Sequence, residues 1–268
     1  MNINRKLFLI LWMASIFGVI VILPYVFTLQ GGIPENLQVS LYVLLTGQII
    51  QNAIIFAIII FIGLKLAKKV GFGLPILESL FEGRKIKNDL KSILEVSIGL
   101  GFLVGILIVG MDYLFSLLGA TINVAQASSI NPPAWQGFLA SFYGGINEEI
   151  MLRLFLMTLI VRILYKIKQS KDGNPTKISI WLAIFLAAII FGAAHLPALM
   201  SITTLTPLLI TRTIILNAVG GVIFGWLLLE KRLGVRNDIS FFRRYCASRN
   251  SSISHIYLNI YKGFNHGK

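Results

Sequence analysis

Two glutamates and an arginine stand close together in an apolar stretch of the chain, in the sequence EEIMLR, as Glu148, Glu149 and Arg153. Glu149 and Arg153 are four residues apart, so in a helix they share a face and can form an ion pair. Glu148 points about 100° away from Glu149 and has no partner on its own helix. A carboxylate left free in this way can take a proton from a water molecule, as a general base does in hydrolysis.

The second candidate for chemistry is His195, in the sequence FGAAH, which places Phe191 one helical turn before it. If the two helices are neighbours, Glu148 and His195 face one polar cavity and can act on one water, with His195 orienting or stabilising it. The same two residues could instead supply two ligands to a metal such as zinc, with more ligands needed from elsewhere. A purely structural alternative is a Glu149–Arg153 clamp between helices, with His195 satisfied in the core.

The elements that carry these residues are membrane helices. Of the 268 residues 56% are hydrophobic and 13% are charged, whereas soluble domains have about 25% charged residues. A spanning helix needs about 20 mostly apolar residues. The sequence therefore predicts an all-α, polytopic transmembrane helix bundle and excludes an ordinary soluble enzyme. Six spans are expected, over Leu7–Leu29, Val39–Leu66, Ile93–Leu118, Phe138–Ile167, Ile178–Leu199 and Leu205–Leu229.

The basic residues predict how the spans are oriented. They lie between spans two and three, between spans four and five, and after span six, while the other loops have no Lys or Arg. Because basic loops stay inside, the N-terminus and these loops are expected in the cytoplasm of a multi-pass plasma-membrane protein, with bacterial origin favoured. The net charge of +13 then indicates contact with membrane lipid rather than nucleic acid. The basic loop between Val70 and Lys91 is either an amphipathic surface helix or a solvated connector.

Three further polar residues lie within the spans. Asp112 is near the outer end of its span and is expected to reach water. Arg212 has no partner in its own span, so it should either extend toward water or pair with an acid on another helix. Asn217 is expected to form a hydrogen bond between helices, with a role in the site as the second possibility.

These residues resemble the motifs of a known family. EEIMLR fits the pattern EExxxR, FGAAH fits FxxxH, and GGVIFGWLLLEKRLG looks like the segment that follows them. Over Trp135–Gly234 the chain resembles the CPBP family of CAAX-prenyl-protease-like and bacteriocin-processing intramembrane proteases, also called Abi. The resemblance implies peptide-bond hydrolysis in a cavity between helices, with Glu148 as base and His195 as its partner. Supporting roles fall to Glu149, Arg153, Phe191 and Asn217.

The resemblance leaves the substrate and the cofactor open. A prenylated CaaX peptide, a leader peptide and a segment of a membrane protein are all compatible substrates. Members are described both as metalloproteases and as glutamate proteases, so zinc is a possible cofactor, and the chain has no HExxH motif. The alternative function is a non-catalytic membrane protein such as a bacteriocin self-immunity factor. A transporter ranks last, because no internal repeat is visible.

The chain departs from the family after Val235, where a last span with His and Asn or Asp four residues later should follow. The sequence becomes polar and basic there, and the pair His255 and Asn259 fits the spacing only by chance. With one choice of synonymous codons, reading residues 237–254 one base later gives MISHFFADIVLHVIVPL, an apolar stretch that contains HFFAD. We therefore expect a shifted reading frame and an impaired protease.

The sequence thus predicts three regions. Residues 1–134 hold the N-terminal spans and the basic loop, and residues 135–234 form the protease core. Residues 235–268 form an aberrant basic tail, poorly ordered and cytoplasmic, which contains the single cysteine, Cys246.

Overall fold

The computed structural model describes residues 4–33, 38–81, 83, 87–120, 132–170, 173–200 and 203–233. They form helices joined by short connections, and the only β-pairing among them is an isolated bridge between Gln169 and Pro175. The helices are α1 (Arg5–Leu29), α2 (Leu41–Lys69), α3 (Pro75–Phe81), α4 (Lys87–Leu117), α6 (Ala134–Tyr143), η1 (Gly144–Glu148), η2 (Ile150–Met157), α7 (Thr158–Ile167), α8 (Lys177–Ala194), α9 (Leu196–Met200) and α10 (Pro207–Leu233). The predicted all-α bundle is confirmed.

Five segments in the described part of the chain are long and apolar enough to cross a membrane. They are Arg5–Leu29, Leu41–Lys69, Ile93–Leu117, Lys177–Met200 and Pro207–Leu227, and they correspond to the first three and last two predicted spans. The protein is therefore a multi-pass membrane protein. The predicted fourth span, Phe138–Ile167, lies within one continuous helical path from Ala134 to Ile167, in which η1 and η2 are π-helical.

The chain divides into two compact units, Met1–Trp226 and Leu227–Lys268. All the candidate site residues belong to the first unit. The predicted aberrant tail, with Cys246, His255 and Asn259, lies outside the described residues, as does the site of the proposed frame change.

Polar residues at the helix starts explain where several helices begin. The side chain of Asn4 accepts hydrogen bonds from the backbone N–H groups of Lys6 and Leu7, and Thr176 accepts one from Ser179. Such caps satisfy donors that have no partner within the first helical turn. Pro133 immediately precedes α6, a position where the missing N–H of proline costs no helical hydrogen bond.

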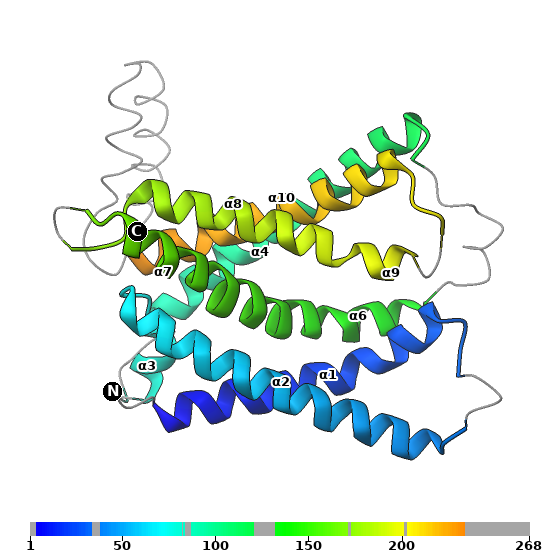
Figure 1. Ribbon diagram of the computed structural model, residues 1–268, viewed down its shortest axis with the longest axis horizontal. Helices are drawn as coiled ribbons and strands as arrows, with labels where there is room; N and C mark the ends of the chain where they lie inside the picture. Colours follow the sequence, from blue (N-terminus) through cyan, green and yellow to red (C-terminus); the bar gives the residue numbers. More distant parts are fainter. Residues whose placement is uncertain are drawn as a thin grey trace, which may run out of the picture. The chain divides into compact units, whose positions relative to one another are not determined.

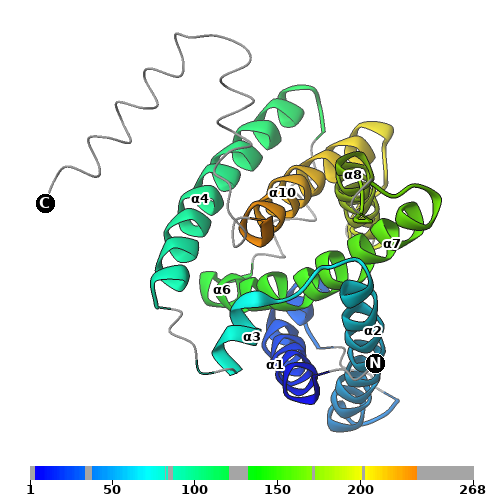
Figure 2. The same ribbon diagram turned by 90° about the vertical axis from the view of Figure 1, so that its left-hand side faces the viewer.

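The helical path from α6 to α7 lies between α1 and α2 on one side and α8 and α10 on the other (Figures 1 and 2). Close approach is possible because glycines stand at the contacts. A Cβ atom on Gly63 of α2 would lie 2.9 Å from the backbone oxygen of Leu154 in η2. A Cβ atom on Gly192 of α8 would lie 2.6 Å from the backbone oxygen of Ile214 in α10. Apolar side chains of α1, α2 and the π-helical path, among them Val19, Phe56, Ile60, Ile150 and Leu154, form the adjoining core.

Asp112 and Arg212 pair across two helices. The Arg212 Nε donates to Asp112 Oδ1 at 2.6 Å, and the two residues lie 100 positions apart in the sequence. The side chain of Asp112 is 43% exposed and that of Arg212 is 19% exposed. Of the two expectations for Arg212, the structure therefore shows pairing with an acid on another helix, while Asp112 is both partly exposed and paired.

Candidate active site

Glu148 lies at the end of a π-helical segment, η1, and Glu149 joins it to a second one, η2. A π-helix closes its hydrogen bonds between residues i and i+5, and such segments are frequent at functional sites. The widened turn is visible in the side chains too, since the Thr158 hydroxyl donates to the backbone oxygen of Arg153, five residues earlier, at 2.8 Å. The first two residues of η1, Gly144 and Gly145, are glycines, so the first turn of this π-helix carries no side chain at these two positions.

The π-helical spacing gives Glu148 a neighbour that α-helical periodicity hides. Residues five apart in an α-helix point about 140° away from each other, whereas in a π-helix they lie on nearly one face. Tyr143 stands five residues before Glu148, and the two side chains are close enough to interact electrostatically. Sequence analysis missed Tyr143 for this reason, and no sequence signal indicates it without knowledge of the π-helix.

Glu148 and His195 come together from two neighbouring elements. η2 and α7 both contact α8, and Glu148 lies within electrostatic reach of His195 at the end of α8 and of Arg153 on its own helix. Both side chains are partly buried. The condition set by the sequence, that the two helices be neighbours, is met.

The histidine has a defined hydrogen bond on one of its two ring nitrogens. His195 Nδ1 lies 2.9 Å from the backbone oxygen of Phe191, and the Phe191 ring meets the imidazole edge-on with centroids 4.6 Å apart. A carbonyl oxygen can only accept, so in neutral His195 the proton is on Nδ1. Nε2 then carries a lone pair, which can accept a hydrogen bond from water or bind a metal.

Glu149 and Arg153 form the predicted ion pair. Arg153 NH2 lies 3.4 Å from Glu149 Oε1, and the side chains are 6% and 40% exposed respectively. Arg153 Nε is buried without a hydrogen-bond partner among the described residues. The pair joins a buried cation to a partly exposed carboxylate, and this carboxylate belongs to the residue next to Glu148.

Asn147 is a further residue that the sequence did not single out. It is fully buried, and its Nδ2 donates to the backbone oxygen of Ser15 on α1 at 2.9 Å. A Cβ atom on Gly18 would overlap Asn147 Oδ1, so only glycine leaves room for this side chain. Because Asn147 immediately precedes Glu148, the contact fixes the start of the glutamate segment against α1. An amide next to two glutamates in an apolar run is the sequence signal that could have indicated it.

Asn217 does not have the role expected first. Its Nδ2 donates to the backbone oxygen of Thr213 on its own helix at 2.8 Å, and among the described residues no bond joins it to another helix. Thr213 is four residues earlier on α10, so the Asn217 amide forms its hydrogen bond within its own helix. Polar side chains in helices often bond to the backbone in this way.

Glu148 and His195 by themselves do not complete a metal site. Catalytic zinc is normally held by three protein ligands, and the described part of the chain contains no group of three His, Cys, Asp or Glu residues arranged to hold a metal. Glu148 and His195 are two such donors. We therefore derive no step through zinc.

Comparison with known proteins finds a family match over the part of the chain that carries these residues. Residues 130–235 match the model of the family described as type II CAAX prenyl endopeptidase Rce1-like. Neither the curated proteins nor the solved structures contain a match to the chain. The matched region holds both glutamates, Arg153 and His195, and it coincides closely with the region that carries the motifs. Residues 130–235 of this chain are therefore similar to the CAAX prenyl endopeptidase family.

Proposed function

We propose that this chain is built as an intramembrane endopeptidase in which Glu148 activates the water that hydrolyses a peptide bond. The observation that carries the proposal is the meeting of Glu148 and His195, from η1 and the end of α8, inside the region that matches a CAAX endopeptidase family. The similarity to this family supports a CAAX-type intramembrane protease. The assignment of base and partner is our inference from the site.

The reaction follows from the protonation states of the two side chains. Glu148 takes a proton from the water, and the resulting hydroxide attacks the scissile carbonyl carbon. The protonated Glu148 then gives that proton to the leaving amine as the carbon–nitrogen bond breaks. His195, with its proton held on Nδ1 by Phe191, accepts a hydrogen bond from the water on Nε2 and so fixes the direction of attack. Of the two roles considered for His195, this tautomer favours orienting the water over stabilising an oxyanion, since an oxyanion needs a donor.

The substrate is proposed by class. A peptide segment in or at the membrane fits a site carried by membrane helices, and both a CaaX C-terminus and a leader peptide belong to this class. The chain would perform this task in the cytoplasmic membrane, with its basic loops inside.

The proposal includes a loss of activity in this particular chain. The third motif, a His followed four residues later by Asp, is present only after a one-base change of reading frame in residues 237–254. Removal of one donor to the reacting oxygen costs about 10²–10³ in rate in proteases. Loss of the whole helix should cost at least as much. Sequencing of the gene across the codon of Val235 tests the frame change directly.

One assay tests the enzymatic proposal. The 268-residue chain and its frame-restored counterpart are placed in membranes with a peptide substrate, each with and without Glu148→Gln. We expect cleavage by the frame-restored chain, and a fall of about 10²–10⁴ in rate on Glu148→Gln, the usual contribution of a general base. Glu95→Gln is the control, because it also removes one carboxylate, from an exposed residue that is not among the site candidates.

Two results would contradict the proposal. Cleavage at an unchanged rate after Glu148→Gln would exclude this residue as the base. Absence of cleavage by both chains, together with a retained protective effect against a bacteriocin, would favour the non-catalytic immunity function.

A further inference from the structure

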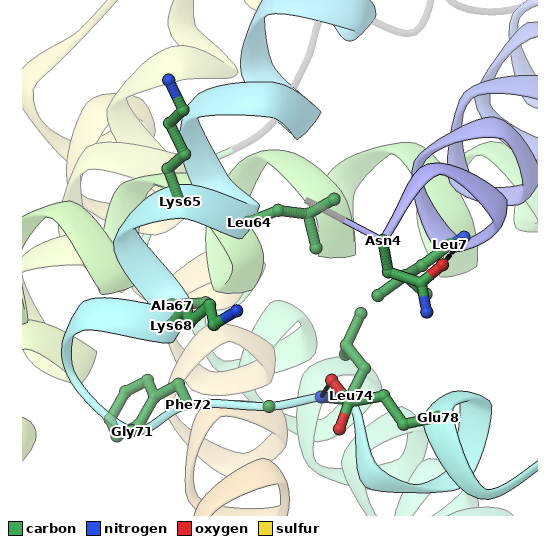
Figure 3. A pocket seen from close by; sticks show the side chains of 11 residues that line it. Asn4, Leu7, Leu64, Lys65, Ala67, Lys68, Gly71, Phe72, Leu74 and Glu78 are labelled. Atoms are coloured by element: carbon green, nitrogen blue, oxygen red, sulfur yellow. Dashed lines mark hydrogen bonds between the residues drawn. The ribbon is translucent and has the colours of Figure 1, made fainter. Parts of the chain in front are cut away.

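A cavity of about 370 Å³ lies at the basic ends of α1 and α2. It is bounded by the first turn of α1, the last two turns of α2, and the segment from Gly71 to Glu78 that turns back toward α1 (Figure 3). Much of its wall is apolar and comes from Leu7, Leu64, Phe72 and Leu74. None of the catalytic candidates lines it.

The charged groups at this cavity have different partners. Lys65 Nζ stacks over the ring of Phe61, 4.2 Å from its centroid. Glu78 Oε1 accepts from the backbone N–H of Leu74 at 3.4 Å, which ties the closing segment to α3. Lys68 has no hydrogen bond or ion pair within the part of the chain that the structure describes. Figure 3 shows the Lys68 ammonium directed into the cavity between Asn4 and Leu74, whereas Lys65 points away.

The location of the cavity matches the boundary between apolar lipid and water. The apolar sequence of α2 gives way here to Lys65, Lys68 and Lys69, and α1 begins here with Arg5 and Lys6. Local positive charge at such a boundary attracts anionic headgroups, and basic pockets between membrane helices bind them. Glu78 also lines the cavity, but one of its carboxylate oxygens is taken up by the Leu74 N–H. Among the described residues, the apolar walls and the Lys68 ammonium fit the start of the acyl chains together with a phosphate.

We propose that this cavity binds one anionic glycerophospholipid, with its phosphate on Lys68 and its first acyl carbons against Leu7, Leu64 and Phe72. The bound lipid would fill the space between α1, α2 and the segment before α3. The proposal is independent of the proteolytic function, since it uses none of the residues of the candidate active site.

The proposal is tested by native mass spectrometry of the full chain, purified in detergent and exposed to phosphatidylglycerol or phosphatidylcholine. We expect one phosphatidylglycerol to be retained in preference to phosphatidylcholine. Lys68→Gln should weaken its retention about fivefold, the effect of one lysine on anionic lipid. Lys69→Gln removes an equal charge from the adjacent residue outside the cavity, and Lys68→Arg keeps the charge, so both should retain the lipid.

Three outcomes would overturn the proposal. Equal loss of lipid in Lys68→Gln and Lys69→Gln would indicate general attraction to the basic end rather than a site. Equal retention of phosphatidylcholine would remove the role of the ammonium. Displacement of the lipid by free glycerol phosphate at similar concentration would indicate a soluble phosphate ligand instead.

Discussion

At the scale of single residues, the Glu149–Arg153 pair is asymmetric, because only the arginine is buried. Removal of one partner from a buried pair costs about 3–5 kcal/mol when it leaves a buried charge unpaired. Glu149→Gln leaves Arg153 in that state. Arg153→Met instead leaves Glu149, whose side chain is 40% exposed and whose carboxylate can become neutral by taking up a proton, which an arginine cannot do by losing one.

We therefore expect Glu149→Gln to lower the thermal unfolding temperature more than Arg153→Met does. The measurement is thermal unfolding of the detergent-solubilised chain, which needs no enzymatic activity. The double variant Glu149→Gln/Arg153→Met should be at least as stable as Glu149→Gln alone. A larger loss in Arg153→Met would show that the arginine stabilises the fold through contacts other than this ion pair.

In the proposed mechanism the two nitrogens of His195 have separate tasks, and amide side chains can replace them one at a time. Asn at position 195 presents a donor near the place of Nδ1, and Gln presents a polar group near the place of Nε2. In the frame-restored chain we expect His195→Asn to unfold at the wild-type temperature but lose cleavage. His195→Gln should keep more activity than His195→Asn, measured as kcat on one peptide. The reverse order would assign the essential task to Nδ1 and contradict the proposed role of Nε2.

At the scale of elements, α1 contacts the glutamate-bearing π-helix at a buried amide, Asn147. Gly18 gives the space that the Asn147 side chain occupies, and Asn147 donates to Ser15 one turn earlier on α1. A buried amide that loses its partner costs about 1–3 kcal/mol. The contact therefore couples the register of α1 to the position of Glu148.

We expect Gly18→Ala to displace Asn147 and lower both stability and cleavage by the frame-restored chain. In a chain that already carries Asn147→Ala, the added methyl group meets no side chain at this point, so Gly18→Ala should then have little further effect. Thermal unfolding and kcat of the four variants form a double-mutant cycle. Gly105→Ala is a control, since a Cβ there meets nothing within 4 Å. Additive effects would show that Gly18 and Asn147 act independently.

At the scale of the whole molecule, the number of crossings determines on which sides the termini lie. Five segments are long and apolar enough to span, and the path from Ala134 to Ile167 would be the sixth. Six crossings place both ends on one side of the membrane, whereas five place them on opposite sides. The distribution of Lys and Arg predicts that this side is the cytoplasm.

Cysteine labelling tests this topology, because Cys246 is the single cysteine of the chain. A membrane-impermeant maleimide should label Cys246 only after the cells are opened. Asn2→Cys in a Cys246→Ser background should give the same result for the N-terminus. Labelling of one end in intact cells would mean that the α6–α7 path does not cross the membrane. Labelling of both ends would reverse the predicted orientation.

The sequence by itself determined the all-α membrane architecture and the Glu149–Arg153 pair. Hydropathy is distributed along the chain in runs of helix-spanning length, and residues four apart meet in a helix whatever surrounds it. Phe191 and His195 came together for the same local reason. The convergence of Glu148 with His195 could be stated only as a condition, since it depends on which helices are neighbours.

Only the tertiary structure decided how the glutamate segment is held. The Asn147–Ser15 bond joins residues 132 positions apart, and the Asp112–Arg212 pair joins residues 100 apart. The π-helix that brings Tyr143 to the face of Glu148 departs from the α-helical period on which sequence reading relies. The Asn147 contact depends on the close approach of α1 at Gly18, and Gly63 allows α2 to approach Leu154 of the same helical path. The physical reason is that contacts between side chains on different helices depend on how closely those helices pack. The spacing of residues along one helix predicts only the contacts within that helix.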